Sequence, residues 1–291
     1  MAEVLVVGPA SWNQLVHLDA LPEPRPHMTF ARGEHETVGG TSAGKALHLV
    51  DLGREVELAT TLGDDEPGRR VEAALRGAGV SLLLERSGPT ERHLNLMAAD
   101  GGRVSIYLAT PEDPAPGALE TVEAEMAGAR ALVLDLSPRA ASMLDAARAS
   151  GVPIWTDLHD YDGVAEFHAP FLEAADFVFC NADRLPDPVE FLRSSVAGGA
   201  RVAVCTLGAQ GAVAMDAELG ELRVPAEPVP SVVDTNGAGD GFAAGFLDAT
   251  LDGAGTLAAL RAGARQAARA LGSRHLSPVL EGSLPAAEGR P

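Results

Sequence analysis

The stretch Asp234–Phe242, DTNGAGDGF, decides how this chain is interpreted. Two glycines and a small residue stand directly before Asp240, and the apolar run 242–247 that follows is typical of a helix. The N–H groups and the dipole at a helix N-terminus favour an anion there. Asp240 would lie in the first helical turn, where a carboxylate can accept a hydroxyl proton while the N–H groups stabilise a transferring phosphoryl group. The stretch therefore predicts phosphoryl transfer to an alcohol. The competing interpretation is an ordinary glycine-rich loop with a helix cap.

Length and charge limit the classes of protein and partner. The chain has 291 residues, of which 46% are hydrophobic, so a large α/β core is feasible and disorder is not expected. The net charge is -19 and the isoelectric point is about 4.7. Nucleic acid and anionic membrane surfaces would be repelled, so neither is expected as a partner. ATP is not excluded, because local N–H groups and bound cations can reverse the sign of the potential at one site.

Three further features predict a cytoplasmic enzyme. Cys180 and Cys205 lie in apolar runs and are interpreted as buried core thiols. The first residues, 1–8, form a short strand pattern without a basic leader. No apolar run approaches the length needed to span a membrane.

Short apolar runs alternate with helical stretches along the chain. The predicted strands are 4–8, 55–63, 131–136, 153–158, 177–181 and 202–208, and the predicted helices are 42–52, 69–77, 140–150 and 188–197. Residues 239–271 are predicted to form helix, turn, helix. Continuous apolar strands that alternate with helices indicate a parallel sheet covered on both faces. We expect one domain over residues 1–291.

Two regions interrupt this alternation. Residues 14–38 contain three prolines and then alternating polar and apolar residues, and residues 90–109 have the pattern of a hairpin with its turn at 100–102. Two extra β segments would form a small sheet on the α/β core. That sheet would be either a lid over an active site or an edge decoration.

DTNGAGDGF resembles the C-terminal signature of the ribokinase-like (PfkB-type) sugar and nucleoside kinases. The resemblance implies a three-layer α/β sandwich with a central, mostly parallel sheet and a small β-sheet lid. It also implies ATP and Mg²⁺ as cofactors. By resemblance Asp240 is the catalytic base, and the amides of Gly237, Ala238 and Gly239 form the anion hole that also contacts the nucleotide.

The segment Gly39–Gly53, GGTSAGKALHLVDLG, resembles the N-terminal signature of the same family, a diglycine that enters a helix. The resemblance places Gly39, Gly40 and Thr41 beside the acceptor sugar, where the absence of side chains lets hydroxyl groups approach the backbone. The segment also fits most of a P-loop, with Asp135 as its metal-binding aspartate. We reject that alternative because residue 46 is alanine, so the hydroxyl that would hold Mg²⁺ is absent.

Two acceptor positions depart from the family pattern. Gly44 stands where many relatives have asparagine, and Asn13 stands where they usually have aspartate. We assign both to the acceptor pocket together with Asp240. An amide at residue 13 can still bond two hydroxyl groups without adding charge. Lys45 is a candidate for supplying the contact that Gly44 lacks. The departures argue against strict ribokinase specificity.

The resemblance places the nucleotide site at two strand ends. Asn181 would contact phosphate, but Arg184 replaces the glutamate that organises Mg²⁺ in relatives, so Asp183 could substitute or Arg184 could bind phosphate itself. The turn TLGAQG at 206–211 resembles a family turn near the nucleotide, with Thr206, Gly208 and Gly211 as contacts. The carbonyls of Asp234 and Thr235 are candidates for a monovalent cation such as K⁺.

Two other motifs are given a structural interpretation. The turn Gly63–Gly68, GDDEPG, is expected to cap a helix. None of the eight histidines has metal-ligand spacing in the sequence. His93 on the lid and His159 after a strand face the predicted site, although packing or surface roles are the simpler expectation for both.

We therefore expect transfer of the ATP γ-phosphoryl group to a hydroxyl of a sugar or sugar-like substrate. One alternative is a nucleoside (adenosine-like) kinase of the same fold, which an apolar lid surface with Leu94, Leu96 or Trp12 stacking on a base would favour. The other alternative is a degenerate paralogue that binds a sugar or nucleotide without turnover. A homodimer through the lid, as in several relatives, is a further expectation.

Overall fold

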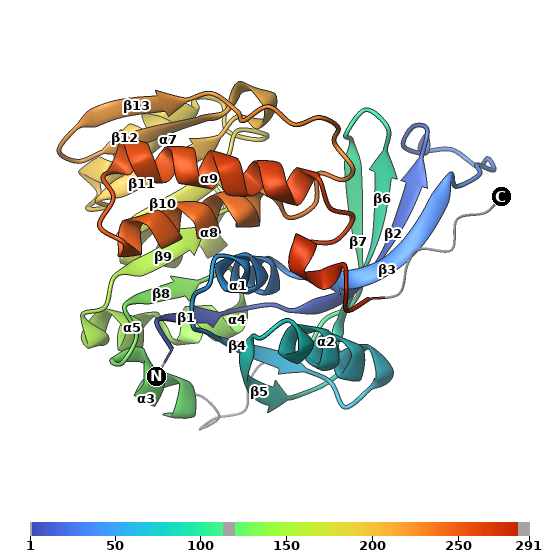
Figure 1. The fold of residues 1–291 in the computed structure, drawn as a ribbon, viewed down its shortest axis with the longest axis horizontal. Helices are drawn as coiled ribbons and strands as arrows, with labels where there is room; N and C mark the ends of the chain where they lie inside the picture. Colours follow the sequence, from blue (N-terminus) through green and yellow to red (C-terminus); the bar gives the residue numbers. More distant parts are fainter. Residues whose placement is uncertain (1, 113–119, 285–291) are drawn as a thin grey trace.

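The computed structural model describes residues 2–112 and 120–284 as a large sheet between two helical layers, with a small sheet beside it (Figure 1). The large sheet has nine strands in the order β13-β12-β11-β10-β9-β8-β1-β4-β5. Their bounds are β1 Val4–Val7, β4 Val56–Leu62, β5 Ser81–Arg86, β8 Ala131–Leu134, β9 Ile154–Asp157, β10 Phe177–Asn181, β11 Val202–Thr206, β12 Ala212–Asp216 and β13 Gly220–Val224. All pairings from β5 to β11 are parallel, and only β12 and β13 are antiparallel.

Burial on both faces explains why these strands are continuous apolar runs. Every residue of β1, β8 and β9 is buried, as the sequence pattern predicts for a covered parallel sheet. One face packs on α1 Thr41–Asp51, α2 Glu66–Gly77, α8 Ala238–Leu251 and α9 Thr256–Leu271. The other packs on α3 Glu120–Met126, α4 Pro138–Ser142, α5 Leu144–Ser150, α6 Ala169–Ala174 and α7 Pro188–Ala197. Single-turn 3₁₀ helices lie at Glu166–His168, Gly208–Gln210 and Pro278–Leu280.

The predicted helix over 140–150 is two helices. The α4 helix ends at Ser142 and α5 begins at Leu144, with Met143 between them at φ −105° and ψ −2°. Ser137 caps α4 because its hydroxyl accepts the N–H of Ala140 at 3.1 Å, so the helix begins earlier than the alanine-rich pattern indicates. Strands β5, β12 and β13 and helices α3 and α6 were not predicted.

The small sheet has the order β3-β2-β6-β7, with bounds β2 Ser11–Leu18, β3 Gly33–Gly39, β6 Glu91–Ala98 and β7 Arg103–Ala109. The predicted hairpin at 90–109 is confirmed as the antiparallel pair β6–β7. The other segment begins three residues earlier than the predicted 14–38, since β2 starts at Ser11. The two hairpins join through a parallel β2–β6 pair, and the sheet stands at one side of the large sheet (Figure 1).

The register divides the small sheet into two unlike faces. Asn13 lies opposite Thr37 on β3 and His93 on β6, so these three side chains share one face. Leu94 and Leu96 sit at even positions. Leu94 is paired with Gln14, which places both leucines on the opposite face. The apolar surface that the nucleoside alternative invokes therefore does not lie on the face of Asn13.

Two local expectations are confirmed. Asp65 in the GDDEPG turn caps α2, accepting the N–H of Gly68 at 2.8 Å, and it also accepts the hydroxyl of Thr90 at 2.6 Å. Cys180 and Cys205 are buried free thiols. Within residues 2–112 and 120–284, no helix is both long enough and apolar enough to cross a membrane.

Candidate functional site

Polar groups gather at the carboxyl edge of the large sheet. Asp135 directly follows β8, Asp157 ends β9, Asn181 ends β10 and Thr206 ends β11. Parallel neighbours place these strand ends side by side. The chain order also reverses beside β1, which pairs with β4 on one side and β8 on the other. Crevices at such reversals are the usual ligand sites of open α/β sheets.

Asp240 lies in the first turn of α8, above this edge, as the sequence predicts. Gly237 precedes the helix in the left-handed region at φ 81°, and a Cβ there would come within 2.3 Å of the Leu276 carbonyl oxygen. Only glycine fits both conditions. The first N–H groups of a helix have no intrahelical acceptor, so the turn from Gly237 to Gly239 can present donors to an anion.

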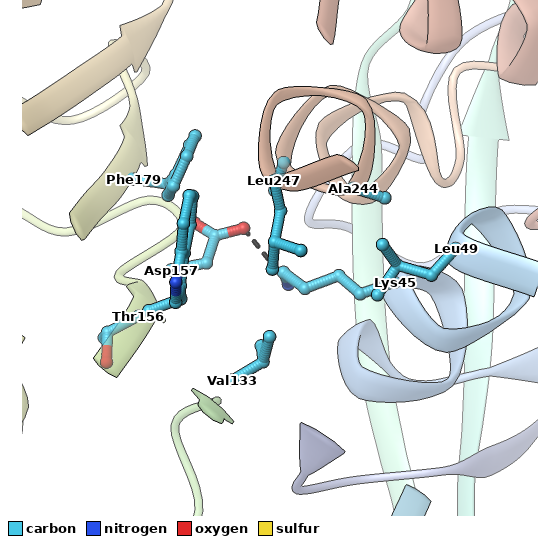
Figure 2. A pocket seen from close by; sticks show the side chains of 10 residues that line it. Lys45, Leu49, Val133, Thr156, Asp157, Phe179, Ala244 and Leu247 are labelled. Carbon is cyan, nitrogen blue, oxygen red and sulfur yellow. Dashed lines mark ion pairs between the residues drawn. The ribbon is translucent and has the colours of Figure 1, made fainter. Parts of the chain in front are cut away.

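Lys45 is the centre of a buried charge cluster. Its ammonium lies 2.9 Å from Asp240 Oδ1, 3.1 Å from Asp135 Oδ1 and 3.2 Å from Asp157 Oδ2, and its side chain is only 3% exposed. The three N–H donors of an ammonium group thus face three carboxylates. Figure 2 shows Lys45 extending from α1 toward Asp157, beneath α8 residues Ala244 and Leu247.

The void beside Lys45 is too small for a substrate. It has a volume of about 10 Å³, close to the minimum for a single water molecule. A larger cavity of about 50 Å³ opens between β9, β10, β11 and α8, and it is lined by Asp157, His159, Phe179, Cys180, Asn181, Thr206 and Gly239. This second cavity joins the predicted nucleotide residues to the start of the predicted anion hole.

Two aspartates in contact with Lys45 have opposite pKa shifts. Burial raises the pKa of Asp240 to about 6, and the charges of Lys45 and His159 only partly oppose this. Burial also acts on Asp157, but His159 and Lys45 outweigh it and lower its pKa to about 2. His159 is close enough for this, with Nδ1 at 3.3 Å from Asp157 Oδ2. The site therefore holds one carboxylate firmly ionised and another near the pH range of a general base.

Gly44 lies against the carboxylate of Asp240. A Cβ at this position would be 2.4 Å from Asp240 Oδ2 and 2.8 Å from its Cγ. An asparagine here, as in relatives, would collide with Asp240 in this arrangement. The structure thus gives one reason for both Gly44 and Lys45. Helix α1 can place Lys45 against Asp240 only because residue 44 has no side chain.

The remaining acceptor candidates lie around the start of α1. Asp135 accepts the hydroxyl of Ser42 at 2.7 Å and that of Thr41 at 3.4 Å. A Cβ on Gly39 would be 2.0 Å from the amide nitrogen of Asn13, and one on Gly40, at φ 91°, would be 2.4 Å from the Pro9 carbonyl oxygen. The structure therefore brings Asn13, the diglycine and Thr41 together on the side of Asp240 toward the small sheet.

Three of the predicted nucleotide contacts, Asn181, Thr206 and Gly239, line the larger cavity, whereas Gly208, Gly211 and Gly237 are not among its lining residues. The turn that begins at Gly208 closes through a 2.8 Å bond from Leu207 N–H to the Gly211 carbonyl. Arg184 instead bonds Asp162 Oδ2 at 3.2 Å and is 58% exposed. Arg184 is not among the residues that line the cavity, and the direct phosphate contact considered for it stays a prediction. The exposed Asp183 bonds the Asn181 amide oxygen through its backbone N–H at 3.0 Å.

Sequence reasoning missed the carboxylate partners of Lys45. Asp135 was considered only as part of the P-loop alternative, and Asp157 was not singled out. The signal was present, since two neighbouring apolar strands both end in aspartate, in ALVLD and PIWTD. The P-loop is not formed, because Lys45 lies within α1 and is enclosed by carboxylates.

Two histidines without metal-ligand spacing in the sequence nevertheless meet in the fold. His17 on β2, His35 on β3 and Asp234 each offer a ligand atom, and these atoms lie within 4.8 Å of one another. These residues are far apart in the sequence, so no short sequence motif indicates that they lie together. Thr235, the other predicted cation residue, uses its carbonyl to accept the N–H of Ala238 at 3.4 Å.

Comparisons with known proteins cover nearly the whole chain. The model of the pfkB family of carbohydrate kinases matches residues 1–281. The chain is 33% identical over 269 residues to acarbose 7(IV)-phosphotransferase of Actinoplanes sp., covering 90% of this chain and 89% of that protein. It is 30% identical over 293 residues to ATP-dependent ribose-1-phosphate kinase of Halopiger xanaduensis, covering 92% and 95%.

Solved structures agree with this fold. The structure of the microbiome-derived acarbose kinase Mak1 is similar with a TM-score of 0.83 at 33% identity, covering 98% of this chain and 95% of that one. Arabidopsis thaliana ribokinase, solved with ribose and ATP, has a TM-score of 0.77 at 22% identity, covering 96% and 95%. The second likeness supports the fold alone.

Proposed function

Because the chain belongs to the pfkB family of carbohydrate kinases, which are phosphotransferases that act on hydroxyl groups, we propose that it transfers the γ-phosphoryl group of ATP to a sugar or sugar-like acceptor. Asp240 is the general base in this proposal. The observation that carries it is a buried carboxylate in the first turn of α8, beside the helix N-terminus that can bind the transferring phosphate.

The electrostatics suit Asp240 to this role. A base works best when its pKa is near the working pH, and burial raises the pKa of Asp240 to about 6. Oδ1 is held by Lys45 at 2.9 Å, which fixes the carboxylate plane. Oδ2 faces Gly44, where no side chain intrudes. Lys45 is a positioning residue, and Oδ2 is the oxygen proposed to accept the hydroxyl proton.

The nucleotide is placed at the cavity along the strand ends. Gly237, Ala238 and Gly239 supply the anion hole, and Asn181, Thr206, Gly208 and Gly211 contact ATP. The acidic chain needs such local donors, since its overall charge would repel a polyphosphate. Gly239 lines the same cavity as Asn181 and Thr206, which supports placing the γ-phosphate beside Asp240.

Oxygen donors suited to Mg²⁺ lie at Asn181, which lines this cavity, and at Asp183 two residues later. The Asn181 amide oxygen and the exposed Asp183 carboxylate would hold the ion together with phosphate oxygens. Mg²⁺ takes few protein ligands at nucleotide sites, so the loss of the family's glutamate at Arg184 is tolerable. Bound there, the ion would neutralise phosphate charge. A K⁺ ion at the carbonyls of Asp234 and Thr235 stays a prediction.

The small sheet favours a sugar over a nucleoside as acceptor. The face that carries Asn13 also carries His93, and both are hydrogen-bonding groups suited to hydroxyl-rich ligands, whereas the buried Thr37 on this face is bonded to His275. Trp12 is 7% exposed and packs under the guanidinium of Arg70, 5.4 Å from its ring centre, so it is not free to stack on a base. Two relatives act on acarbose by name, which is consistent with a sugar-like acceptor larger than ribose.

A substrate panel tests this proposal. Purified protein with ATP and Mg²⁺ is offered acarbose, maltose, ribose, ribose 1-phosphate, inosine and adenosine, and ADP release is measured with a coupled assay. We expect acceptor-dependent turnover with at least one sugar or sugar-like compound and much lower kcat/KM for the nucleosides. Preferential turnover of nucleosides would establish the alternative activity. ATP binding without turnover of any acceptor, in a panel widened to other polyols, would indicate the degenerate paralogue.

The exposed face of β7 carries the proposed dimer surface. Val104 and Ile106 lie opposite Leu96 and Leu94 and are each 42% exposed, whereas Tyr107 packs against His93 on the other face. The apolar face with Val104 and Ile106 is the part of the lid that we propose a second copy would cover. Light scattering of wild type and Ile106→Glu tests it, since a lid-mediated dimer is expected to dissociate in the variant.

A further inference from the structure

A histidine pair and an aspartate meet where the small sheet approaches the loop before α8. We propose that His17, His35 and Asp234 form a binding site for a divalent transition-metal ion, with Zn²⁺ as the best match. One ligand atom from each residue lies within 4.8 Å of the other two. The site shares Asp234 with the predicted monovalent-cation position, and it does not depend on the proposed acceptor.

The spacing of the two imidazoles fits a shared ion better than a hydrogen bond. His17 Nε2 and His35 Nδ1 are 3.4 Å apart. Bonds of about 2.0–2.1 Å at a tetrahedral angle separate two zinc-bound nitrogens by about 3.4 Å. Hydrogen bonds between nitrogen and its acceptor are usually about 2.7–3.2 Å. The pair is therefore already at ligand spacing.

A second, independent observation at Asp234 also indicates a cation site. It is 5% exposed, and its Oδ1 accepts the N–H of Asn236 at 2.8 Å. Its Oδ2 is buried and has no hydrogen-bond partner among the described residues. A buried, unpaired carboxylate oxygen is costly, and a bound cation would remove that cost. The oxygen belongs to the residue that faces both imidazoles.

His35 has the supporting contact that metal-bound histidines usually have. Its Nε2 lies 2.9 Å from the carbonyl oxygen of Arg274, to which it can only donate. This fixes the proton on Nε2 and leaves the lone pair of Nδ1 directed toward His17. The tautomer required of a ligand is thus set by the backbone.

The donor set selects the class of ion. Two imidazoles and one carboxylate suit Zn²⁺ and its transition-metal neighbours, whereas Mg²⁺ prefers an all-oxygen set. Three protein ligands leave the fourth tetrahedral position for water. An ion here would join strands β2 and β3 of the small sheet to the loop that leads into Gly237. Metal occupancy would therefore hold the small sheet against the body of the protein.

Calorimetry with the metal alone tests the site. Protein without an affinity tag is stripped with EDTA and titrated with Zn²⁺ in the absence of nucleotide. We expect one ion per chain in the wild type, and affinity at least about 100-fold weaker in His17→Gln and in His35→Gln, since even loss of an outer partner costs about 10–100-fold. His27→Gln is the matched control, because His27 is exposed on the same β2–β3 connection. It is expected to bind like the wild type.

Two more readouts separate binding from folding. Co²⁺ should give the intense visible absorption of a tetrahedral site in the wild type and lose it in both histidine variants. Without metal, the variants should melt at the wild-type temperature, and saturating Zn²⁺ should raise the Tm of the wild type and His27→Gln only. Unchanged Zn²⁺ affinity in the His17→Gln His35→Gln double variant, or no Zn²⁺ binding by the wild type at millimolar concentration, overturns the proposal.

Discussion

The edge of the large sheet and the face of the small sheet hold different kinds of polar group. On the large sheet, Lys45 and three aspartates are almost fully enclosed charges bonded to one another. On the small sheet, the inner polar groups such as Asn13 and Thr37 are neutral and buried, and the residues of β7 are almost all exposed. Charges fixed by one another suit a reaction that needs one geometry, whereas neutral hydrogen-bonding groups suit recognition of an acceptor. Changes at the two places should therefore affect different kinetic constants.

Removal of the proposed base should give the largest effect. We expect Asp240→Asn to lower kcat by about 10²–10⁴-fold, the usual cost of losing a general base, with ATP affinity largely kept. Initial rates and isothermal titration with ATP measure the two quantities. Asp145→Asn is the control, because Asp145 is fully exposed on α5. Near-wild-type turnover by Asp240→Asn would disprove this role for the large-sheet edge.

A methyl group at Gly44 should displace the base. Because a Cβ there would lie 2.4 Å from Asp240 Oδ2, we expect Gly44→Ala to lower kcat by about 100-fold, the cost of a misplacement of about 1 Å. Gly77→Ala in α2 is the matched control, since no atom lies within 4 Å of a Cβ there. If both alanine variants have wild-type kcat, Asp240 does not need the position that the structure gives it.

Loss of the central cation should change both stability and pH dependence. In Lys45→Met three buried carboxylates lose their shared partner, so we expect a loss of about 3–5 kcal/mol in unfolding free energy. Asp240 must be ionised to act, and its pKa of about 6 means that wild-type kcat/KM falls as the pH drops through about 6. Lys45 lowers that pKa, so its removal should move this acid limb to higher pH.

Denaturant unfolding and a pH series of kcat/KM measure these effects. Arg148→Met, which removes an exposed cation that is 3.9 Å from Asp145, should change neither. If Lys45→Met instead abolishes ATP binding while the unfolding free energy stays unchanged, the rejected P-loop interpretation must be revived.

A change on the small sheet should act mainly on the acceptor. We expect Asn13→Ala to raise the acceptor KM by about tenfold with little change in kcat, since a single hydrogen bond contributes about 0.5–1.5 kcal/mol. Gln14→Ala is the control because its side chain points to the other face and bonds Glu34. Asn13→Asp alone should shift the acceptor profile, whereas a Gly44→Asn change would be confounded by its collision with Asp240. A lower kcat with unchanged KM would remove the contrast between the two sheets.

Lid closure should give the smallest signal. We expect bound acceptor to slow amide hydrogen exchange in residues 11–39 and 91–109, because the small sheet should order on the substrate. Segments 131–134 and 154–157, at the centre of the large sheet, serve as the internal reference. Slowing confined to 206–240 would mean that the small sheet is an edge decoration.

The sequence alone was sufficient to predict the α/β architecture and the position of Asp240 at the start of a helix. Continuous apolar strands and a helix start after GAG are local patterns, and the fold preserves them. The edge strand β13 was missed because GELRV alternates polar and apolar residues. Strand β5 and the interior strand β12 have only short apolar runs, at 82–84 and 212–215, which were not recognised as strands. The helix break at Met143 was missed because alanine-rich sequence on both sides conceals it.

The contacts of the site were less predictable. Lys45 meets Asp135, Asp157 and Asp240 only through the sheet order, and nothing in the local spacing of these residues records it. His17 and His35 are not even direct neighbours in the register, since His35 lies opposite Leu15 and His17 opposite Gly33. Such diagonal contacts depend on the register of the β2–β3 pair, which the connection between the strands sets. The residue types in this connection do not specify that register.

The bond between Lys45 and Asp240 joins residues that are 195 positions apart in the chain. During synthesis, the first two aspartates emerge and can neutralise the lysine long before the helix that carries the third. The nascent chain can thus fold around β1, β8 and β9 without leaving the lysine unpaired. Catalytic competence would be the last property gained, when α8 closes over a charge cluster that is already formed, and long-range closure of this kind is slow.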